Sequence, residues 1–148
     1  MKEYSLLQCK YIQGVRMKIC GVELSGGDAI FAIVDDGNWQ ECNTKKITFG
    51  DSLDRRSARF FYEAVNAFAR DQHIELFAIK QRQDSGRFAG GGITFKMEAI
   101  FQLCPDADVI VVHSKTIAKD QKKNNWLRPD SMNKYQEVAY FTAQCASR

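Results

Sequence analysis

Hydrophobic residues occur in two patterns along this chain, as short runs and as stripes at helical spacing, and together they predict an α/β fold. The runs Ile19–Leu24 and Ala29–Val34 are apolar, apart from one acid, as in strands that are buried on both faces. Ser25–Asp28 lies between them and contains two glycines, which predicts a tight turn because glycine tolerates positive φ. A third strand is expected at Lys45–Phe49, within the segment Trp39–Phe49, so the chain should begin with a three-stranded antiparallel meander.

Downstream of the meander, helical stripes alternate with short apolar runs. The expected elements are a helix over Leu53–Gln72, a strand over Ile74–Ile79, a helix over Ile93–Leu103, a strand over Asp108–Val112, a helix over Lys115–Lys123 and a last helix that ends at Cys145. The expected N-caps are Asp51 or Ser52, then Ser114, then Asp130 or Ser131. This order predicts a mixed sheet with the first strand in its centre, the meander on one side, parallel strands on the other, and helices on both faces.

Length and composition are those of one ordinary globular domain, with 148 residues of which 45% are hydrophobic and 26% charged. Residues 1–16 precede a second methionine, Met17, and we interpret them as an extension to a domain over 17–148. Whether they are native is left open, and the alternative is an additional strand or arm.

No segment resembles a membrane span or a signal-peptide core, so we expect a cytoplasmic protein without a membrane partner. The five cysteines lack metal-ligand spacing, which favours reduced thiols over a zinc site.

Glu23 is the one acid in an apolar run that is expected to lie at the centre of the sheet. Burying a carboxylate without a partner is costly. Glu23 should therefore be paired, bound to a metal ion, or placed at the exposed end of its strand. This residue is the main chemical lead in the sequence.

A glycine run is suited to binding phosphate. Gly90, Gly91 and Gly92 lie just before an expected helix, and free backbone N–H groups at a helix N-terminus favour an anion. Arg87 lies upstream and Lys96 lies one turn into the helix, so both are candidate phosphate ligands. A hinge, or a close approach of the helix to the sheet, explains the glycines equally well.

A basic stripe is the second candidate for phosphate binding. Lys115, Lys119 and Lys122 follow helical spacing and can contact successive phosphates of a nucleic acid. The loop Asn124–Trp126 follows, and its indole is suited to stacking on an unpaired base. A solvated helix face is the alternative, and the net charge of +3 permits nucleic-acid binding without arguing for it.

Three stretches carry a resemblance to a known family: MKICGVELSGGDAIFAIV, FAIKQRQDSGRFAGGGITFKMEAIFQL and KYQEVAYFTA. They cover most of residues 17–143 in order, and the chain resembles the bacterial family of domain of unknown function 3010 (DUF3010). The resemblance implies a ribonuclease H-like fold, distantly similar to RuvC-type Holliday-junction resolvases and YqgF-like proteins. The name of the family records that its activity is not established.

The resolvases resemble this chain at three places, which here hold Glu23, Lys80 and Glu137. Resolvases have carboxylates at all three, because two magnesium ions need several oxygen ligands. A lysine at the second place changes the local charge by about two units, which disfavours a two-metal site. Two arrangements remain: an ion-paired cluster, or one Mg or Mn ion held by Glu23 and Glu137, with Lys80 stabilising charge on a phosphate. The structural alternatives are a salt-bridge cluster that only fixes the core, and a surface pairing of Glu137 with Lys134.

We therefore expect a protein that binds or processes nucleic acid with a degenerate site of Glu23, Lys80 and Glu137. If it is an enzyme, the resemblance implies a metal-dependent nuclease or a resolvase-like hydrolase. Two alternatives from other classes are kept. One is a non-catalytic module that binds a protein or forms a homodimer, and the other is a binder of a small phosphate ligand.

Overall fold

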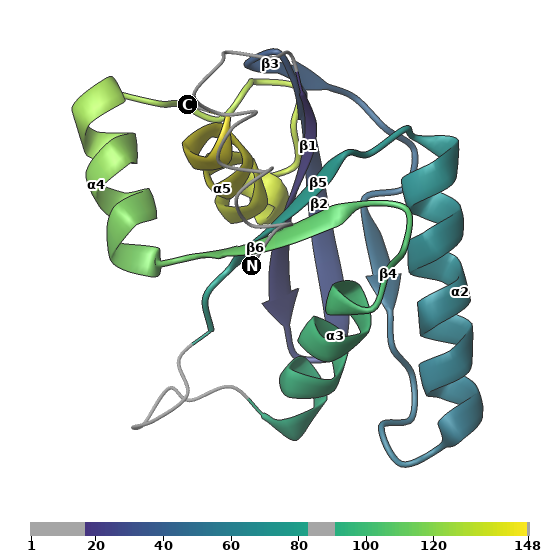
Figure 1. Ribbon diagram of the computed structural model, residues 1–148. Helices are drawn as coiled ribbons and strands as arrows, with labels where there is room; N and C mark the ends of the chain where they lie inside the picture. The colour runs from purple at the N-terminus through teal and green to yellow at the C-terminus, as the bar shows by residue number, and fades with distance from the viewer. Residues whose placement is uncertain (1–16, 83–90, 148) are drawn as a thin grey trace, which may run out of the picture.

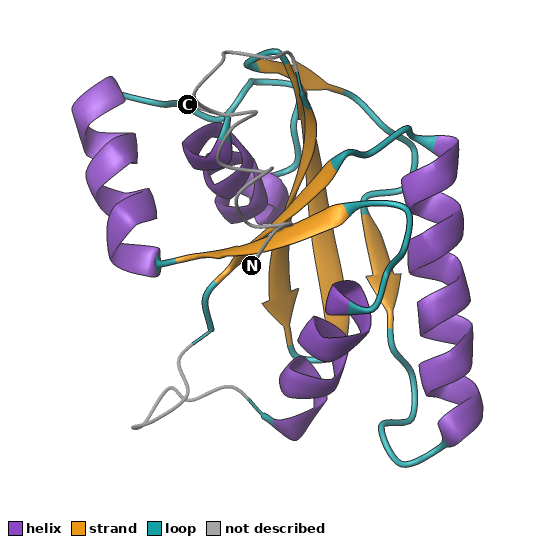
Figure 2. Cartoon of the chain, viewed as in Figure 1, coloured by secondary structure: helices purple, strands orange, loops and turns teal. Residues whose placement is uncertain are grey.

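The computed structural model describes residues 17–82 and 91–147 as a mixed sheet with helices on both faces (Figure 1). The strands are β1 (Lys18–Ser25), β2 (Asp28–Asp35), β3 (Asn38–Gln40), β4 (Lys46–Thr48), β5 (Leu76–Lys80) and β6 (Asp108–Val112). The helices are α2 (Arg55–Asp71), α3 (Gly92–Gln102), α4 (Ser114–Asn124) and α5 (Glu137–Ala146), the last preceded by the 3₁₀ turn η1 (Lys134–Gln136). Figure 2 shows these helices around the sheet. Within the described ranges, no helix is long and apolar enough to cross a membrane.

The strands have the order β3-β2-β1-β5-β6, with β4 also paired to β2. β1 and β2 are antiparallel and are joined by a tight turn at Gly26, which has a φ of 59°. β1, β5 and β6 are parallel to one another. The predicted mixed sheet, with the first strand in the centre and the antiparallel meander on one side, is therefore confirmed.

The third strand expected at Lys45–Phe49 is confirmed as β4, and a further short strand that was not expected, β3, precedes it. β3 pairs with the end of β2 that follows Ala32, and β4 pairs with the end that precedes Phe31. Between them the backbone N–H of Phe31 still donates to Lys45, but the carbonyl of Phe31 accepts the side chain of Gln136 at 2.9 Å. A side chain from the last helical segment thus takes the place of a strand partner at this point.

The expected helix caps are also corrected. α2 is capped by Asp54, whose carboxylate accepts the backbone N–H of Arg56 at 2.8 Å, while Asp51 accepts that of Leu53 in the preceding turn. α4 is capped by His113, whose Nδ1 accepts the backbone N–H of Lys115 at 3.1 Å. The last helix begins only at α5, because residues 129–132 form a turn and η1 follows it.

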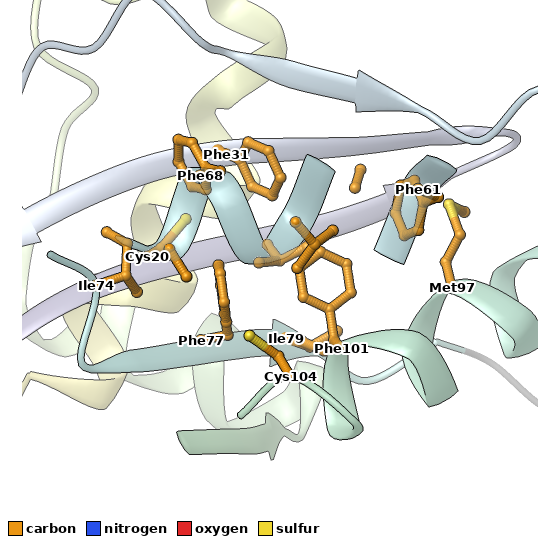
Figure 3. Close-up of a cluster of buried hydrophobic side chains, with 14 of the residues drawn as sticks. Cys20, Phe31, Phe61, Phe68, Ile74, Phe77, Ile79, Met97, Phe101 and Cys104 are labelled. Atoms are coloured by element: carbon orange, nitrogen blue, oxygen red, sulfur yellow. The ribbon is translucent and has the colours of Figure 1, made fainter. Parts of the chain in front are cut away.

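Alternate residues of the central strand contribute to two separate cores. Cys20 and Val22 lie in the larger core against α2 and α3, where Phe31 and Phe68 stack with their ring centroids 4.5 Å apart (Figure 3). Ile19 lies in the smaller core, which α5 covers. Because side chains alternate along a strand, the odd-numbered residues of β1 face α5. Glu23 is one of them.

Candidate functional site

Glu23 and Lys80 lie side by side at the carboxyl ends of two central parallel strands. Leu76 and Ala78 of β5 lie in the α5-side core, so Lys80, the last residue of β5, faces the same side as Glu23. The parallel register pairs Val22 with Ile79, and one further step along both strands places Glu23 beside Lys80. The sheet thus brings these two predicted site residues together on one face.

The environment of Glu23 opposes its ionisation. Burial raises the pKa of the Glu23 carboxyl above its ordinary value, and the nearby Lys80 ammonium offsets part of that increase. Within the described residues, neither side chain makes a hydrogen bond or a close ion pair. The site therefore holds a half-buried carboxylate and a cation that interact at longer range.

Glu137 has a different partner. It is the first residue of α5, and its Oε2 lies 3.7 Å from Nε of Arg128, rather than pairing with Lys134. The preceding residue, Gln136, is bound to the carbonyl of Phe31 on β2. This end of α5 is thus held over β2, and the described contacts of Glu137 include neither Glu23 nor Lys80.

The donor set does not fit the divalent ion that the resemblance implies. Among the residues that the structure describes, no group of three or more His, Cys, Asp and Glu side chains could hold a metal ion. Next to Glu23 the sheet places an ammonium, which repels a cation instead of binding it. We therefore assign no step of a reaction to a metal ion.

A second ion pair, which the sequence analysis missed, lies just beyond the end of β5. Nη2 of Arg82 lies 3.0 Å from Oε2 of Glu98 on α3, and each side chain is only 16% exposed. The guanidinium also lies over the ring of Phe95, 3.2 Å from its centroid. The sequence contained a signal for this pair. Glu98 directly follows Met97, a core residue of α3, so an acid at this position is expected to be partly buried and to need a cationic partner.

The glycine run is only partly described. Arg87 and Gly90 lie outside the described residues, so their predicted roles stay predictions. Gly91 is the N-cap residue of α3, and Gly92 is its first helical residue. Lys96 donates to the backbone carbonyl of Ser52, so its ammonium already has a partner in the connection that precedes α2.

The basic stripe lies on α4 as predicted. Lys115, Lys119 and Lys122 are all exposed, and none of them has an ion-pair partner in the described part of the chain. α4 begins directly after β6, whose Val112 is paired with Lys80 in the sheet. The stripe therefore starts at the same rim as the Glu23–Lys80 pair.

The loop after α4 does not present a free stacking surface. The ring of Trp126 is stacked on Phe141 of α5, with 6.5 Å between the centroids, and the residue is half-buried. The side chain of Asn124 donates to the carbonyl of Asp120, and Asn125 forms the left-handed C-cap of α4. Asn124 and Asn125 thus terminate α4, and Trp126 packs the following loop against α5.

Comparison of the whole structure with solved structures gives its fold. Thermus thermophilus RuvC matches with a TM-score of 0.63 at 6% identity, over 88% of this chain and 92% of that one. RuvC from the same organism in complex with a Holliday junction substrate matches with a TM-score of 0.62 at 7% identity, over 88% and 91% of the two chains. The yeast mitochondrial Holliday junction resolvase Ydc2 gives a TM-score of 0.51 at 6% identity, over 97% and 82%. The predicted ribonuclease H-like fold is confirmed.

Comparison by sequence gives the family. A search of curated proteins finds no match. The family described as "Protein of unknown function (DUF3010)" matches residues 17–146, which include every described strand and helix. The chain is therefore a member of the DUF3010 family, with the ribonuclease H-like fold that it shares with RuvC.

Proposed function

We propose that this protein binds nucleic acid through its phosphates at the rim formed by the carboxyl ends of β1, β5 and β6. The observation that carries the proposal is the position of Lys80, a half-buried cation beside Glu23 at the end of a central parallel strand. Open α/β sheets bind their ligands at the carboxyl ends of parallel strands. A phosphate there would gain a charge-assisted contact with the ammonium.

The lysines of α4 extend this rim. Lys115, Lys119 and Lys122 recur at helical spacing, and they are exposed along a helix whose first residue lies two positions after the sheet partner of Lys80. A row of cations suits a polymer with regularly spaced phosphates better than it suits a single small anion. The RuvC structure determined with a Holliday junction substrate has the same fold, which supports nucleic acid, branched DNA included, as the partner.

The role that fits Glu23 and Lys80 is binding rather than two-metal cleavage. Glu23 attracts the ammonium of Lys80 and limits the positions that it can occupy, so the cation is oriented before a phosphate arrives. Glu137 is engaged by Arg128, and the described residues offer no cluster of three metal ligands. A protein that retains the rim of a nuclease fold with a lysine in place of one of its carboxylates would hold nucleic acid and not cut it.

Fluorescence anisotropy with labelled single-stranded, duplex and four-way-junction DNA tests the proposal. Binding should weaken steeply with salt. The variant Lys115→Gln/Lys119→Gln should bind more weakly, and the slope of log K against log salt should fall by about one for each lysine removed. The matched control, Arg55→Gln/Arg59→Gln, removes the same charge from exposed positions of α2, on the opposite side of the molecule (Figure 1), and should leave binding nearly unchanged.

Lys80→Gln should also weaken binding to all three DNAs, because a phosphate contact carries no sequence information. If no DNA is bound at low salt, or if the α2 control loses as much affinity as the α4 variant, the proposed rim is wrong.

Self-association is a second candidate function, and the exposed apolar residues near the start of α2 favour it. Leu53 is 89% exposed and Phe60 is 67% exposed. Burying such side chains between two copies would remove apolar area from water. Sedimentation of the native chain and of Phe60→Ser should give a dimer and a monomer, respectively, if this surface is an interface.

A further inference from the structure

A groove lies beside the proposed phosphate site, along β6 and between the start of α4 and the end of α5. Its volume is about 380 Å³, within the range of about 300–1,000 Å³ that is typical of small-ligand sites. It is lined by Ile110–Val112 of β6, by His113 and Thr116 at the start of α4, and by Cys145 and Ala146 at the end of α5. In the described part of the sheet β6 is the edge strand, so no neighbouring strand covers this side.

The groove is next to Lys80. Val112 lines it and is paired with Lys80, on a strand that lies about 4.8 Å from β5. Lys115 precedes Thr116, which also lines the groove, so a second exposed cation is nearby on α4. An apolar groove therefore lies close to two residues, Lys80 and Lys115, that are proposed to bind phosphates.

The walls of the groove combine apolar surface with hydrogen-bonding groups. Ile110 and Val112 supply aliphatic surface, and Thr116 contributes a hydroxyl. Because Nδ1 of His113 accepts the N–H of Lys115, the neutral imidazole carries its proton on Nε2, where it can donate to a ligand. The thiol of Cys145 already donates to Asp120, with Sγ 3.1 Å from Oδ2.

We infer that the groove takes one unpaired nucleobase of the nucleic acid whose phosphates bind Lys80 and α4. The inference rests on the proposed function and specifies its substrate class. A nucleotide joins a flat, largely apolar ring to an anionic phosphate through one sugar, which matches an apolar groove with cations next to its lining residues. A base paired within a duplex cannot enter such a groove, so the protein prefers unpaired strands.

The test compares two labelled oligomers with equal numbers of phosphates: a ten-nucleotide thymidine oligomer and a ten-residue abasic oligomer. The native chain should bind the thymidine oligomer about tenfold more tightly, because a base in the groove buries apolar area against the aliphatic walls. Thr116→Trp, which fills the groove from an exposed position, should remove this preference and keep the salt dependence. Ala118→Trp adds the same bulk to another exposed position of α4 that does not line the groove, and it should keep the preference.

The outcomes separate the inference from the function on which it rests. Salt-dependent binding of both oligomers with equal affinity would leave the phosphate rim in place and overturn the base groove. Equal loss of preference in Thr116→Trp and Ala118→Trp would also overturn it, because the base would then lie elsewhere. Failure to bind either oligomer at low salt would overturn the proposed function itself.

Discussion

Gly21 of β1 and Ala139 of α5 are in direct backbone contact. A Cβ atom at Gly21 would lie 1.8 Å from the carbonyl oxygen of Ala139 and 2.9 Å from the backbone nitrogen of Ala143. Only a residue without a side chain permits the helix to cross the central strand at this depth. Glu23 is the next residue of β1 on the same face, so this contact sets how closely α5 approaches the candidate site.

Gly21→Ala should therefore destabilise the fold by at least about 3 kcal/mol. Overpacking typically costs about 1–3 kcal/mol, and here the clashing atoms belong to the backbone and cannot rotate away. Urea denaturation followed by circular dichroism measures the change in the free energy of unfolding. Gly91→Ala is the matched control, because a Cβ atom there meets none of the described residues within 4 Å, and its cost should stay below about 1 kcal/mol. A loss below 1 kcal/mol for Gly21→Ala would contradict the contact.

Glu23→Gln should make the protein more stable near neutral pH. Burial raises the pKa of Glu23 above the ordinary value of 4.5 for a glutamate, so between 4.5 and the raised pKa the folded chain keeps a proton that the unfolded chain releases. The stability of the native chain therefore falls as pH rises through this window, whereas glutamine has no proton to lose. Urea denaturation at about pH 4 and about pH 7.5 should show a larger stability gain of the variant at the higher pH.

A control for that measurement is Glu63→Gln, which removes the charge of an exposed glutamate on α2 and reports the effect of net charge alone. If Glu23→Gln lowered stability, and lowered it more at about pH 7.5 than at about pH 4, Glu23 would be a structural member of an ion-paired cluster. The description of Glu23 as a half-buried acid whose burial outweighs its attraction to Lys80 would then be wrong.

Breaking the ion pair between Arg82 and Glu98 should cost about 3 kcal/mol, because either single change leaves a largely buried charge without its partner. Arg82→Met and Glu98→Leu should each be destabilising, and the double variant should cost less than the sum of the two. A double-mutant cycle in urea measures this coupling. Arg56→Met is the comparison, since the Arg56 side chain is 88% exposed in its pair with Asp54, and its cost should be below about 1 kcal/mol. Additive single effects would show that Arg82 and Glu98 do not stabilise one another.

Features that follow from the local pattern of hydrophobic residues and glycines could be predicted from the sequence alone. Ile19, Cys20 and Val22 mark a strand buried on both faces, and the two glycines after Leu24 mark its turn, so the central hairpin and the position of Glu23 followed directly. Lys80 was found through the resemblance, and the parallel register then placed it beside Glu23.

Contacts between distant segments were not predictable in this way. Gln136 binds the carbonyl of Phe31 across 105 residues of sequence, between the parts of β2 that pair with β3 and β4, and that contact positions the start of α5. The ion-pair partner of Glu137 depends on where α5 starts over the sheet, and the helical pattern of the sequence does not specify that position. The same holds for Arg82, whose partner lies on an element that is separated from it by residues outside the described range.

Lys80→Glu should convert the candidate site into one that responds to divalent cations. Two carboxylates side by side repel each other, so the variant should be less stable than the native chain without metal. Millimolar manganese chloride should then raise its melting temperature by several degrees, since a ligand at a hundred times its Kd stabilises by about 2.7 kcal/mol. Lys119→Glu, which makes the same change at an exposed position of α4, should show no such response. The native chain should respond as little as this control, because its ammonium occupies the place of a ligand. An equal rise for the native chain and Lys80→Glu would mean that Glu23 already binds a cation with other residues, and that Lys80 does not prevent it.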